Sequence, residues 1–152
     1  MVTPAAATIH ASAVLVATRA VLIRGPAGSG KSRLALALIE ASRSGLLVLA
    51  RLVADDRAHV EAVNGRLLVR PAETLAGLIE VRGLGLRRLP YEPVAVVGLV
   101  VDLAAADAQR LPETSNSVIE GIEVPRLAVA AGRDPLLCVL AALTTADAAG
   151  GS

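Results

Sequence analysis

Short runs of aliphatic residues, separated by polar stretches, extend along most of the chain. Two such runs, Ala13–Thr18 and Ala20–Arg24, predict two strands near the beginning of the sequence. The stretch Lys31–Ser42 contains neither Gly nor Pro and predicts a helix, which Gly45 ends. A further apolar run, from Leu46 to Asp56, predicts a strand that ends in two aspartates. Strands that alternate with a helix in this way indicate an α/β fold.

The middle of the chain has the pattern of strands joined by turns. Asn64–Gly65 lies between two alternating runs and predicts a hairpin, because a type I′ turn needs positive φ at both central residues. The segment Ile79–Leu86 predicts a short strand followed by a glycine-spaced turn, and a long apolar run ending at Asp102 predicts a buried strand. We therefore expect a mixed sheet with a hairpin arm.

The last third predicts a loop, a strand and a helix. Residues 104–120 contain Pro, Ser and Asn and predict a mobile loop, and residues 122–130 predict another short strand. Asp134 is suited to the N-cap of a helix and Pro135 to its first position. Cys138 lies in an apolar run of that helix, so we expect it to be buried in the core.

Composition narrows the classes of function. The 152 residues fit one domain, 1–152, and 54% are hydrophobic, which is enough for a sizeable core. Aromatic residues make up 1% and the net charge is +1, so we expect no nucleic-acid partner, because rings for base stacking and a basic face are lacking. Charged residues interrupt every apolar run before about 18 residues, so no membrane span is expected. The chain has a single cysteine, which cannot form an internal disulfide, so we expect a cytoplasmic location.

The sequence GPAGSGKS matches the P-loop motif G-x-x-x-x-G-K-[ST] in full. A strand-like run precedes it and a helix-forming run follows it, which is the context that the motif requires. Backbone amides of such a loop and the helix N-terminus bind phosphate oxygens, while the lysine reaches the β- and γ-phosphates and the serine hydroxyl ligates Mg²⁺. The chain's only lysine stands in this motif. We expect ATP and Mg²⁺ to bind at Gly25, Pro26, Ala27, Gly28, Ser29, Gly30, Lys31 and Ser32.

A P-loop site also needs an acidic residue at a strand end, and the chain offers two candidates. Asp55 and Asp56 are adjacent carboxylates, an arrangement that is costly unless a cation or a proton is shared between them, so they are the preferred functional pair. Asp102 lies at the end of another strand. Its position in the sequence fits either a role at the site or the cap of a turn or helix. His10 precedes the first of the two predicted N-terminal strands, and a lone histidine is most often structural or exposed.

In this order and spacing, four features resemble the catalytic, C-terminal domain of HPr kinase/phosphorylase, especially its short forms. They are His10 before a strand, the P-loop, LVADD at Leu52–Asp56 and IEVRGLGL at Ile79–Leu86. The segment Gly121–Leu136 also looks like the late strand of this family and its turn into a helix. The resemblance runs from His10 to about Leu143 and implies a protein-serine kinase/phosphorylase of a phosphotransferase system.

The resemblance implies roles for individual residues. Such an enzyme uses ATP to phosphorylate a serine of the carrier protein HPr, and removes that phosphate with inorganic phosphate, releasing pyrophosphate. By position, Asp55 would be the general base, with His10 beside the transferred phosphate and Arg82 near the reacting centre. Asp56 and Glu80 would help Ser32 to hold Mg²⁺, and Arg110 matches an arginine of a mobile loop. Members of the family form hexamers, so the resemblance implies a homo-oligomer.

Two other functions fit the P-loop. A small-molecule kinase of the nucleoside-monophosphate type normally has several arginines in a lid, whereas the loop 104–120 contains only Arg110. A non-catalytic nucleotide sensor is favoured by Arg33, where the family commonly has an acidic residue, and by the absence after Leu143 of the basic tail helix found in the family. A P-loop by itself does not prove turnover, so the three functions must be separated by experiment.

Overall fold

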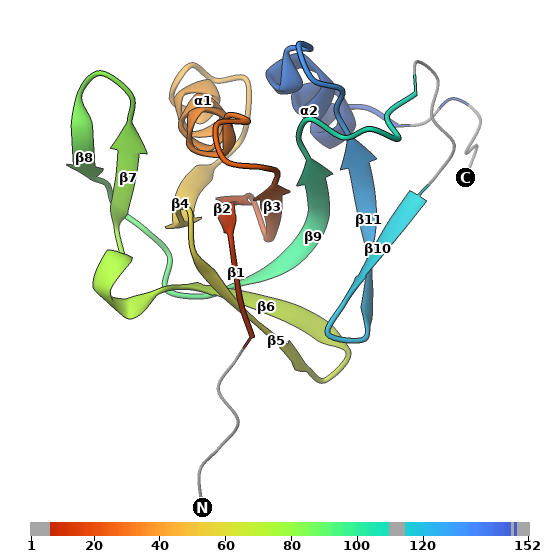
Figure 1. Cartoon of the computed structure of the whole chain (residues 1–152), viewed down its shortest axis with the longest axis horizontal. Coiled ribbons are helices and arrows are strands. Elements are labelled where there is room, and N and C mark those ends of the chain that lie inside the picture. Colours follow the sequence, from red (N-terminus) through yellow and green to blue (C-terminus); the bar gives the residue numbers. More distant parts are fainter. Residues whose placement is uncertain (1–6, 110–114, 147, 149–152) are drawn as a thin grey trace, which may run out of the picture.

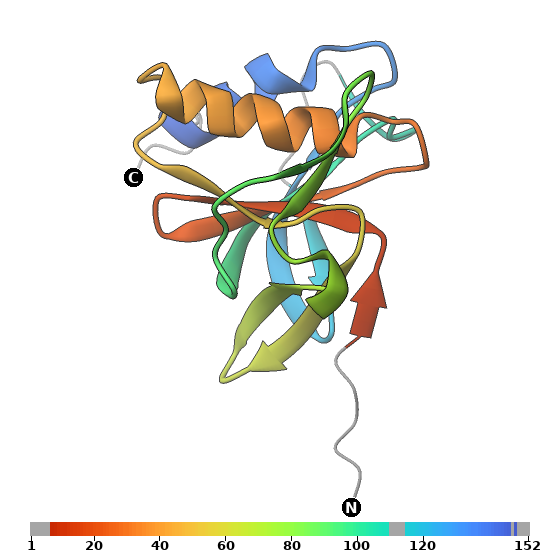
Figure 2. The ribbon, with the colours of Figure 1, turned by 90° about the vertical axis from the view of Figure 1, so that its left-hand side faces the viewer.

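The aliphatic runs form a curled mixed sheet with both helices lying over one of its faces (Figures 1 and 2). The computed structural model describes residues 7–109, 115–146 and 148. Nine strands make up the main sheet, and two more form a separate hairpin. The main-sheet strands are β1 Ala7–Ile9, β2 Ala11–Val16, β3 Arg19–Arg24, β4 Ala50–Ala54, β5 Ala58–Val63, β6 Arg66–Pro71, β9 Ala95–Asp102, β10 Ser115–Ile119 and β11 Ile122–Ala128. The hairpin strands are β7 Leu78–Val81 and β8 Gly85–Arg88; the helices are α1 Lys31–Arg43, the 3₁₀ turn η1 Glu73–Leu75 and α2 Pro135–Thr144.

The order of the strands determines which strand ends lie near one another. The main path is β1-β5-β6-β9-β3-β2-β4, and β11 pairs with β9 and with β10. Strands β3, β9 and β11 are parallel, and β4 also runs parallel to β3 because both are antiparallel to β2. Since parallel strands have their carboxyl ends at the same edge, the segments that follow β4, β3, β9 and β11 lie together at one edge of the sheet.

Strand β3 is buried on both faces, which explains its unbroken apolar sequence. Val21 and Ile23 belong to the cluster between the sheet and the helices, whereas Ala20 and Leu22 belong to a second cluster on the opposite face. Alternate side chains of a strand point to opposite faces, so each of the four residues from Ala20 to Ile23 packs into one of two cores. The P-loop sequence is thus anchored at the centre of the molecule.

Most of the predicted elements are confirmed. The mixed sheet and the C-terminal helix are present, and α1 begins at Lys31. The hairpin of β5 and β6 turns at Asn64 and Gly65, with φ of 50° and 77°. Asp134 caps α2 through a hydrogen bond from the Leu136 N–H at 2.9 Å. The start of α1, the Asn64–Gly65 turn and the Asp134 cap depend on local sequence, which explains why the pattern was sufficient to predict them.

Two predictions were wrong in part. The strand expected from Leu46 begins only at Ala50, because the chain first closes the end of α1 through a hydrogen bond from the Leu46 N–H to the Ala41 carbonyl. The loop expected over 104–120 ends in β10, which pairs with β11 across a tight turn at Glu120 and Gly121. Residues 110–114 of that loop lie outside the described part of the chain.

Cys138 is exposed rather than buried. Helix α2 contacts the core through Leu136, Val139, Leu140 and Leu143, which share one helical face by their spacing. Position 138 falls outside that face, so an apolar run was not sufficient to place its side chain. In the described part of the chain, no helix has the length and apolar character needed to cross a membrane.

Candidate functional site

The P-loop sequence forms a turn between the end of β3 and the start of α1. Gly25 directly follows β3, and Lys31 is the first residue of α1. A Cβ added at Gly25 would lie 2.5 Å from the Ser29 Oγ and 3.2 Å from the backbone oxygen of Leu103. Glycine therefore lets the loop fold back on itself and pack against the segment after β9. Position 25 tolerates no side chain without a shift of these neighbours.

The Lys31 side chain folds over the loop. Its Nζ donates hydrogen bonds to the carbonyl oxygens of Gly25 at 2.9 Å and Pro26 at 3.4 Å, and the residue is buried. Among the residues that the structure describes, Lys31 forms no ion pair with a carboxylate, unlike five of the chain's arginines. A buried ammonium without a carboxylate partner at a helix N-terminus favours the binding of an anion.

Asp55 is the centre of a hydrogen-bond network next to this loop. Its Oδ1 accepts hydrogen bonds from the Ser32 hydroxyl at 2.6 Å and from the Ser12 hydroxyl at 2.7 Å. Its Oδ2 accepts the backbone N–H of Glu80 at 3.0 Å. Asp55 is 6% exposed, and three donors from three different elements hold the carboxylate in place. This burial is tolerated because a buried carboxylate is stabilised when its oxygens are hydrogen-bonded.

Asp56 has a different environment from Asp55. Its side chain is exposed, and its backbone has a φ of 64°, which is unusual for a residue other than glycine. The Asp56 N–H donates to the Ser12 Oγ at 3.2 Å, and its carbonyl oxygen accepts the Ala11 N–H at 3.1 Å. The Ser32 hydroxyl donates to Asp55 and not to Asp56. The turn instead leaves the Asp56 carboxylate facing solvent.

The other expected site residues that the structure describes are exposed, and two of them are linked to this network through the backbone or through a neighbouring residue. His10 is exposed and adjacent to Ala11, the residue that is hydrogen-bonded to Asp56. Glu80 binds Asp55 through its backbone, and its own side chain is exposed. Arg82 is exposed in the turn that joins β7 to β8. Arg110 lies outside the described residues.

The described residues contain no ready-made cluster of three or more His, Cys, Asp or Glu side chains that would hold a metal ion. Magnesium is usually held by one or two carboxylates together with substrate phosphates and water, so a P-loop site does not need such a cluster. The Ser32 hydroxyl, hydrogen-bonded to Asp55, is an arrangement that fits Mg²⁺ bound with a nucleotide.

Asp102, the other strand-end acid, is paired with arginines. Arg24 donates to both of its carboxylate oxygens, at 2.7 and 2.8 Å, and Arg126 donates to Oδ2. Burial raises the pKa of Asp102, but the hydrogen bonds from Arg24 and Arg126 outweigh burial and hold the pKa below its ordinary value. Arg126 also binds Asp107, and the pKa of Arg126 is raised by its hydrogen bonds to Asp107 and Asp102. The Asp102 carboxylate therefore ties β3, β9 and β11 together.

Sequence reasoning missed Ser12, which is fully buried and contacts both aspartates. It stands in β2 as the polar residue of the apolar stretch ASAVLV, and that isolated position was the only available signal. The pairing of β2 with β4 brings Ser12 to Asp55, and the pattern of a single strand does not reveal that pairing.

Comparison with known proteins gives a consistent result. The family model described as HPr Serine kinase C-terminal domain matches residues 3–91, more than half of the chain. An HPr kinase/phosphorylase of Streptococcus thermophilus is 41% identical over 80 residues, which are 52% of this chain and 24% of the relative. One from Clostridium beijerinckii is 37% identical over 78 residues, 51% of this chain and 24% of the relative. The matched region thus spans about a quarter of the length of these curated relatives.

A solved structure agrees over nearly the whole chain. The Hpr(Ser) kinase/phosphatase from Coxiella burnetii superposes with a TM-score of 0.75 and 26% sequence identity. The alignment covers 90% of this chain and 93% of that one. The similarity therefore includes most of the residues after position 91, where the family model ends.

Proposed function

The chain belongs to the HPr serine kinase C-terminal domain family, and we propose that it is a protein-serine kinase/phosphorylase acting on an HPr-like phosphocarrier protein. With ATP and Mg²⁺ it would phosphorylate a serine of the carrier, and with inorganic phosphate it would remove that group. The observation that carries the proposal is the hydrogen bond between the P-loop Ser32 and the buried Asp55, at 2.6 Å. It brings a candidate base to the place where a P-loop holds the terminal phosphate.

The proposed chemistry uses Asp55 in both directions. In the kinase reaction the serine oxygen attacks the γ-phosphorus, the bond from this phosphorus to the β,γ-bridging oxygen breaks, ADP leaves, and the serine proton passes to Asp55. In phosphorolysis an oxygen of inorganic phosphate attacks the phosphorus of phosphoserine. The serine oxygen then leaves with a proton from Asp55, and pyrophosphate forms. A base of this kind typically contributes 10²–10⁴-fold to the rate.

The hydrogen bonds of Asp55 support this role. Ser12 and the Glu80 backbone hold the carboxylate from outside the P-loop, at 2.7 and 3.0 Å. The environment of the Ser32 hydroxyl would change when a metal–nucleotide complex binds, because its oxygen would then ligate the metal. Asp55 would thus stay oriented by the first two donors while a substrate serine approaches.

Positive charge would come from Lys31, with Ser32, Asp56 and Glu80 as the residues that hold Mg²⁺. When bound, Mg²⁺ would neutralise the charge that develops on the β- and γ-phosphates. The Asp56 and Glu80 side chains are exposed, and their backbones are linked to the Ser12–Asp55 network. Both side chains are therefore accessible to a metal that arrives with ATP.

His10, Arg82 and Arg110 complete the proposed site. His10 adjoins the Ala11–Asp56 hydrogen bond, and Arg82 follows Glu80 by two residues in the same hairpin. We propose that the two arginines neutralise the negative charge of the phosphoryl group during transfer. His10 would lie beside that group. The same proposal includes a homo-oligomeric enzyme that meets its carrier protein in the cytoplasm.

The test is phosphoryl transfer from ATP and Mg²⁺ to a purified HPr-like carrier from the same organism, measured as a mass increase of the carrier. We expect a phosphoserine adduct with the wild-type protein and none with Asp55→Asn, although both proteins bind ATP. Incubation of the phosphorylated carrier with inorganic phosphate should return the unmodified mass and release pyrophosphate. Tight ATP binding without an adduct would instead favour the nucleotide sensor.

A further inference from the structure

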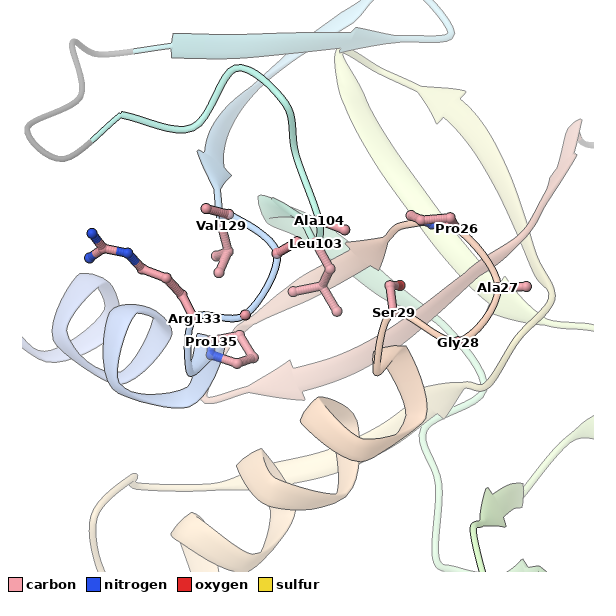
Figure 3. Close-up of a pocket in the computed structure, with 12 residues that line it drawn as sticks. Pro26, Ala27, Gly28, Ser29, Leu103, Ala104, Val129, Arg133 and Pro135 are labelled. Carbon is pink, nitrogen blue, oxygen red and sulfur yellow. The ribbon is translucent and has the colours of Figure 1, made fainter.

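The P-loop also borders a hollow on the side away from Asp55. This pocket has a volume of about 320 Å³ and lies between the P-loop, the residues after β9 and the turn that leads from β11 into α2 (Figure 3). A volume near 300 Å³ is at the lower end of those found for small-molecule sites. The pocket is lined by Pro26, Ala27, Gly28, Ser29, Leu103, Ala104, Val129, Ala130, Ala131, Gly132, Arg133 and Pro135.

We infer that this pocket binds the nucleoside part of the phosphoryl donor, its purine ring and ribose. The inference rests on the proposed function, because it takes the reacting phosphate to lie next to Asp55. Strand β4, which ends directly before Asp55, lies on one side of β3 beyond β2, and β9 and β11 lie on the other side. A triphosphate chain bound along the P-loop with its terminal phosphate at Asp55 therefore directs its nucleoside toward the ends of β9 and β11, where the pocket opens.

The walls of the pocket suit a flat, largely apolar group. Leu103 and Val129 are buried side chains that face the hollow, and Pro135 closes it near the start of α2 (Figure 3). Aliphatic carbons of this kind contact the faces of a planar ring through dispersion and exclude water from them. Gly25 makes the arrangement possible, because any side chain there would push the loop away from Leu103.

One polar atom of the pocket wall lacks a partner. The Ser29 Oγ is buried and has no hydrogen-bond partner among the residues that the structure describes. A buried hydroxyl without a partner costs free energy. In Figure 3 the Ser29 side chain lies on the P-loop side of the hollow, across from Leu103. A ribose hydroxyl or a phosphate oxygen of the bound nucleotide would provide the missing hydrogen bond.

The same walls predict weak selection between bases. Among the lining residues only Ser29 and Arg133 have polar side chains, and the Arg133 side chain points away from the P-loop (Figure 3). Strong discrimination needs buried groups that hydrogen-bond one base and are left unpaired by another. Backbone groups and water would satisfy the ring edges here, so ATP and GTP should bind within about tenfold of each other.

The test compares ATP with inorganic tripolyphosphate, which presents the phosphates without a nucleoside. Binding of both ligands, with Mg²⁺, is measured by calorimetry for the wild type and for Ala131→Trp, which places a large side chain at the exposed rim of the pocket. We expect the variant to bind ATP about tenfold more weakly and tripolyphosphate within twofold of the wild type. The matched control is Ala62→Trp, at an exposed alanine on the hairpin of β5 and β6, which should change neither affinity.

Each outcome is informative. Unchanged ATP binding by Ala131→Trp, or an equal loss for both ligands, would overturn the assignment of the pocket. Failure of the wild type to bind either ligand would contradict the proposed phosphotransferase itself. As a measurement that needs no variant, photolabelling with 8-azido-ATP should modify residues 103–104 or 129–133, and labelling confined to other segments would also overturn the inference.

Discussion

The Ser12 hydroxyl donates a hydrogen bond to Oδ1 of Asp55 at 2.7 Å, joining β2 to the end of β4 inside the molecule. The same Ser12 oxygen accepts the N–H of Asp56 at 3.2 Å, so one buried hydroxyl contacts both members of the acidic pair. Neither contact involves the P-loop. The sheet therefore positions both aspartates from outside the P-loop, in addition to the hydrogen bond that Ser32 donates to Asp55.

Replacing Ser12 with alanine should slow phosphoryl transfer more than it weakens ATP binding. Loss of one buried hydrogen bond should lower the free energy of unfolding by about 1–2 kcal/mol, measured by urea denaturation. The displaced Asp55 carboxylate should lower kcat about tenfold, with KM for ATP within about twofold. Ser12→Thr retains a hydroxyl and should recover most of the rate. A Thr variant as slow as the Ala variant would contradict a positioning role for this hydroxyl.

The two aspartates should differ in what their loss does to activity. Asp55→Asn removes the proposed proton acceptor and should lower the rate by about 10²–10⁴-fold at every Mg²⁺ concentration. Asp56→Asn removes an exposed carboxylate near the metal, so it should mainly raise the Mg²⁺ concentration needed for half-maximal activity. Magnesium titrations of both variants, with carrier phosphorylation measured by mass, distinguish these effects. If Mg²⁺ restores Asp55→Asn and leaves Asp56→Asn inactive, the two roles are exchanged.

Lys31 should not be replaceable by arginine, although the chain uses arginine for every other strong base. The Lys31 Nζ is buried between the carbonyl oxygens of Gly25 and Pro26, where a planar guanidinium would not fit in the same way. We expect Lys31→Arg to weaken ATP binding at least tenfold, close to the effect of Lys31→Gln, as measured by calorimetry. Arg33→Lys, a change at an exposed position two residues further along α1, serves as the control. Wild-type affinity in Lys31→Arg would show that charge alone is sufficient.

The arginine pair on Asp102 should make stability depend on acid pH. The pKa of Asp102 is lowered in the folded protein, so its contribution is fully present above the ordinary value near 4 and is lost as the pH falls through the folded value. At pH 7 Asp102→Asn should reduce the free energy of unfolding by about 1–3 kcal/mol, because Arg24 and Arg126 lose their charged partner.

The difference between Asp102→Asn and the wild type should narrow toward pH 3, as measured by urea denaturation at both pH values. Glu61→Gln provides a control, because its ion pair with Arg70 is exposed and should contribute little at any pH. A difference that stays constant between pH 7 and pH 3 would show that the Asp102 charge is not what stabilises this edge of the sheet.

The sequence by itself determined the features that depend on neighbouring residues. The P-loop followed by α1, the Asn64–Gly65 turn and the Asp134 cap each arise from interactions within a few residues, so local patterns predicted them. The acidic pair was identified because two adjacent carboxylates are unusual at the end of a strand. The family, too, could be recognised from short segments in a particular order.

Only the tertiary structure decided which distant residues meet. Ser12 reaches Asp55 across 43 positions of the chain, and Arg24 reaches Asp102 across 78. Such contacts depend on which strands pair and in what register. The side chains of one strand alternate between the two faces of the sheet with a period of two, whichever strand lies next to it, so this pattern does not reveal the neighbour. For the same reason the exposure of Cys138 and the pocket between the P-loop and the end of β11 could not be predicted. Both depend on how α2 packs against the sheet, which is decided by the whole core rather than by any one segment.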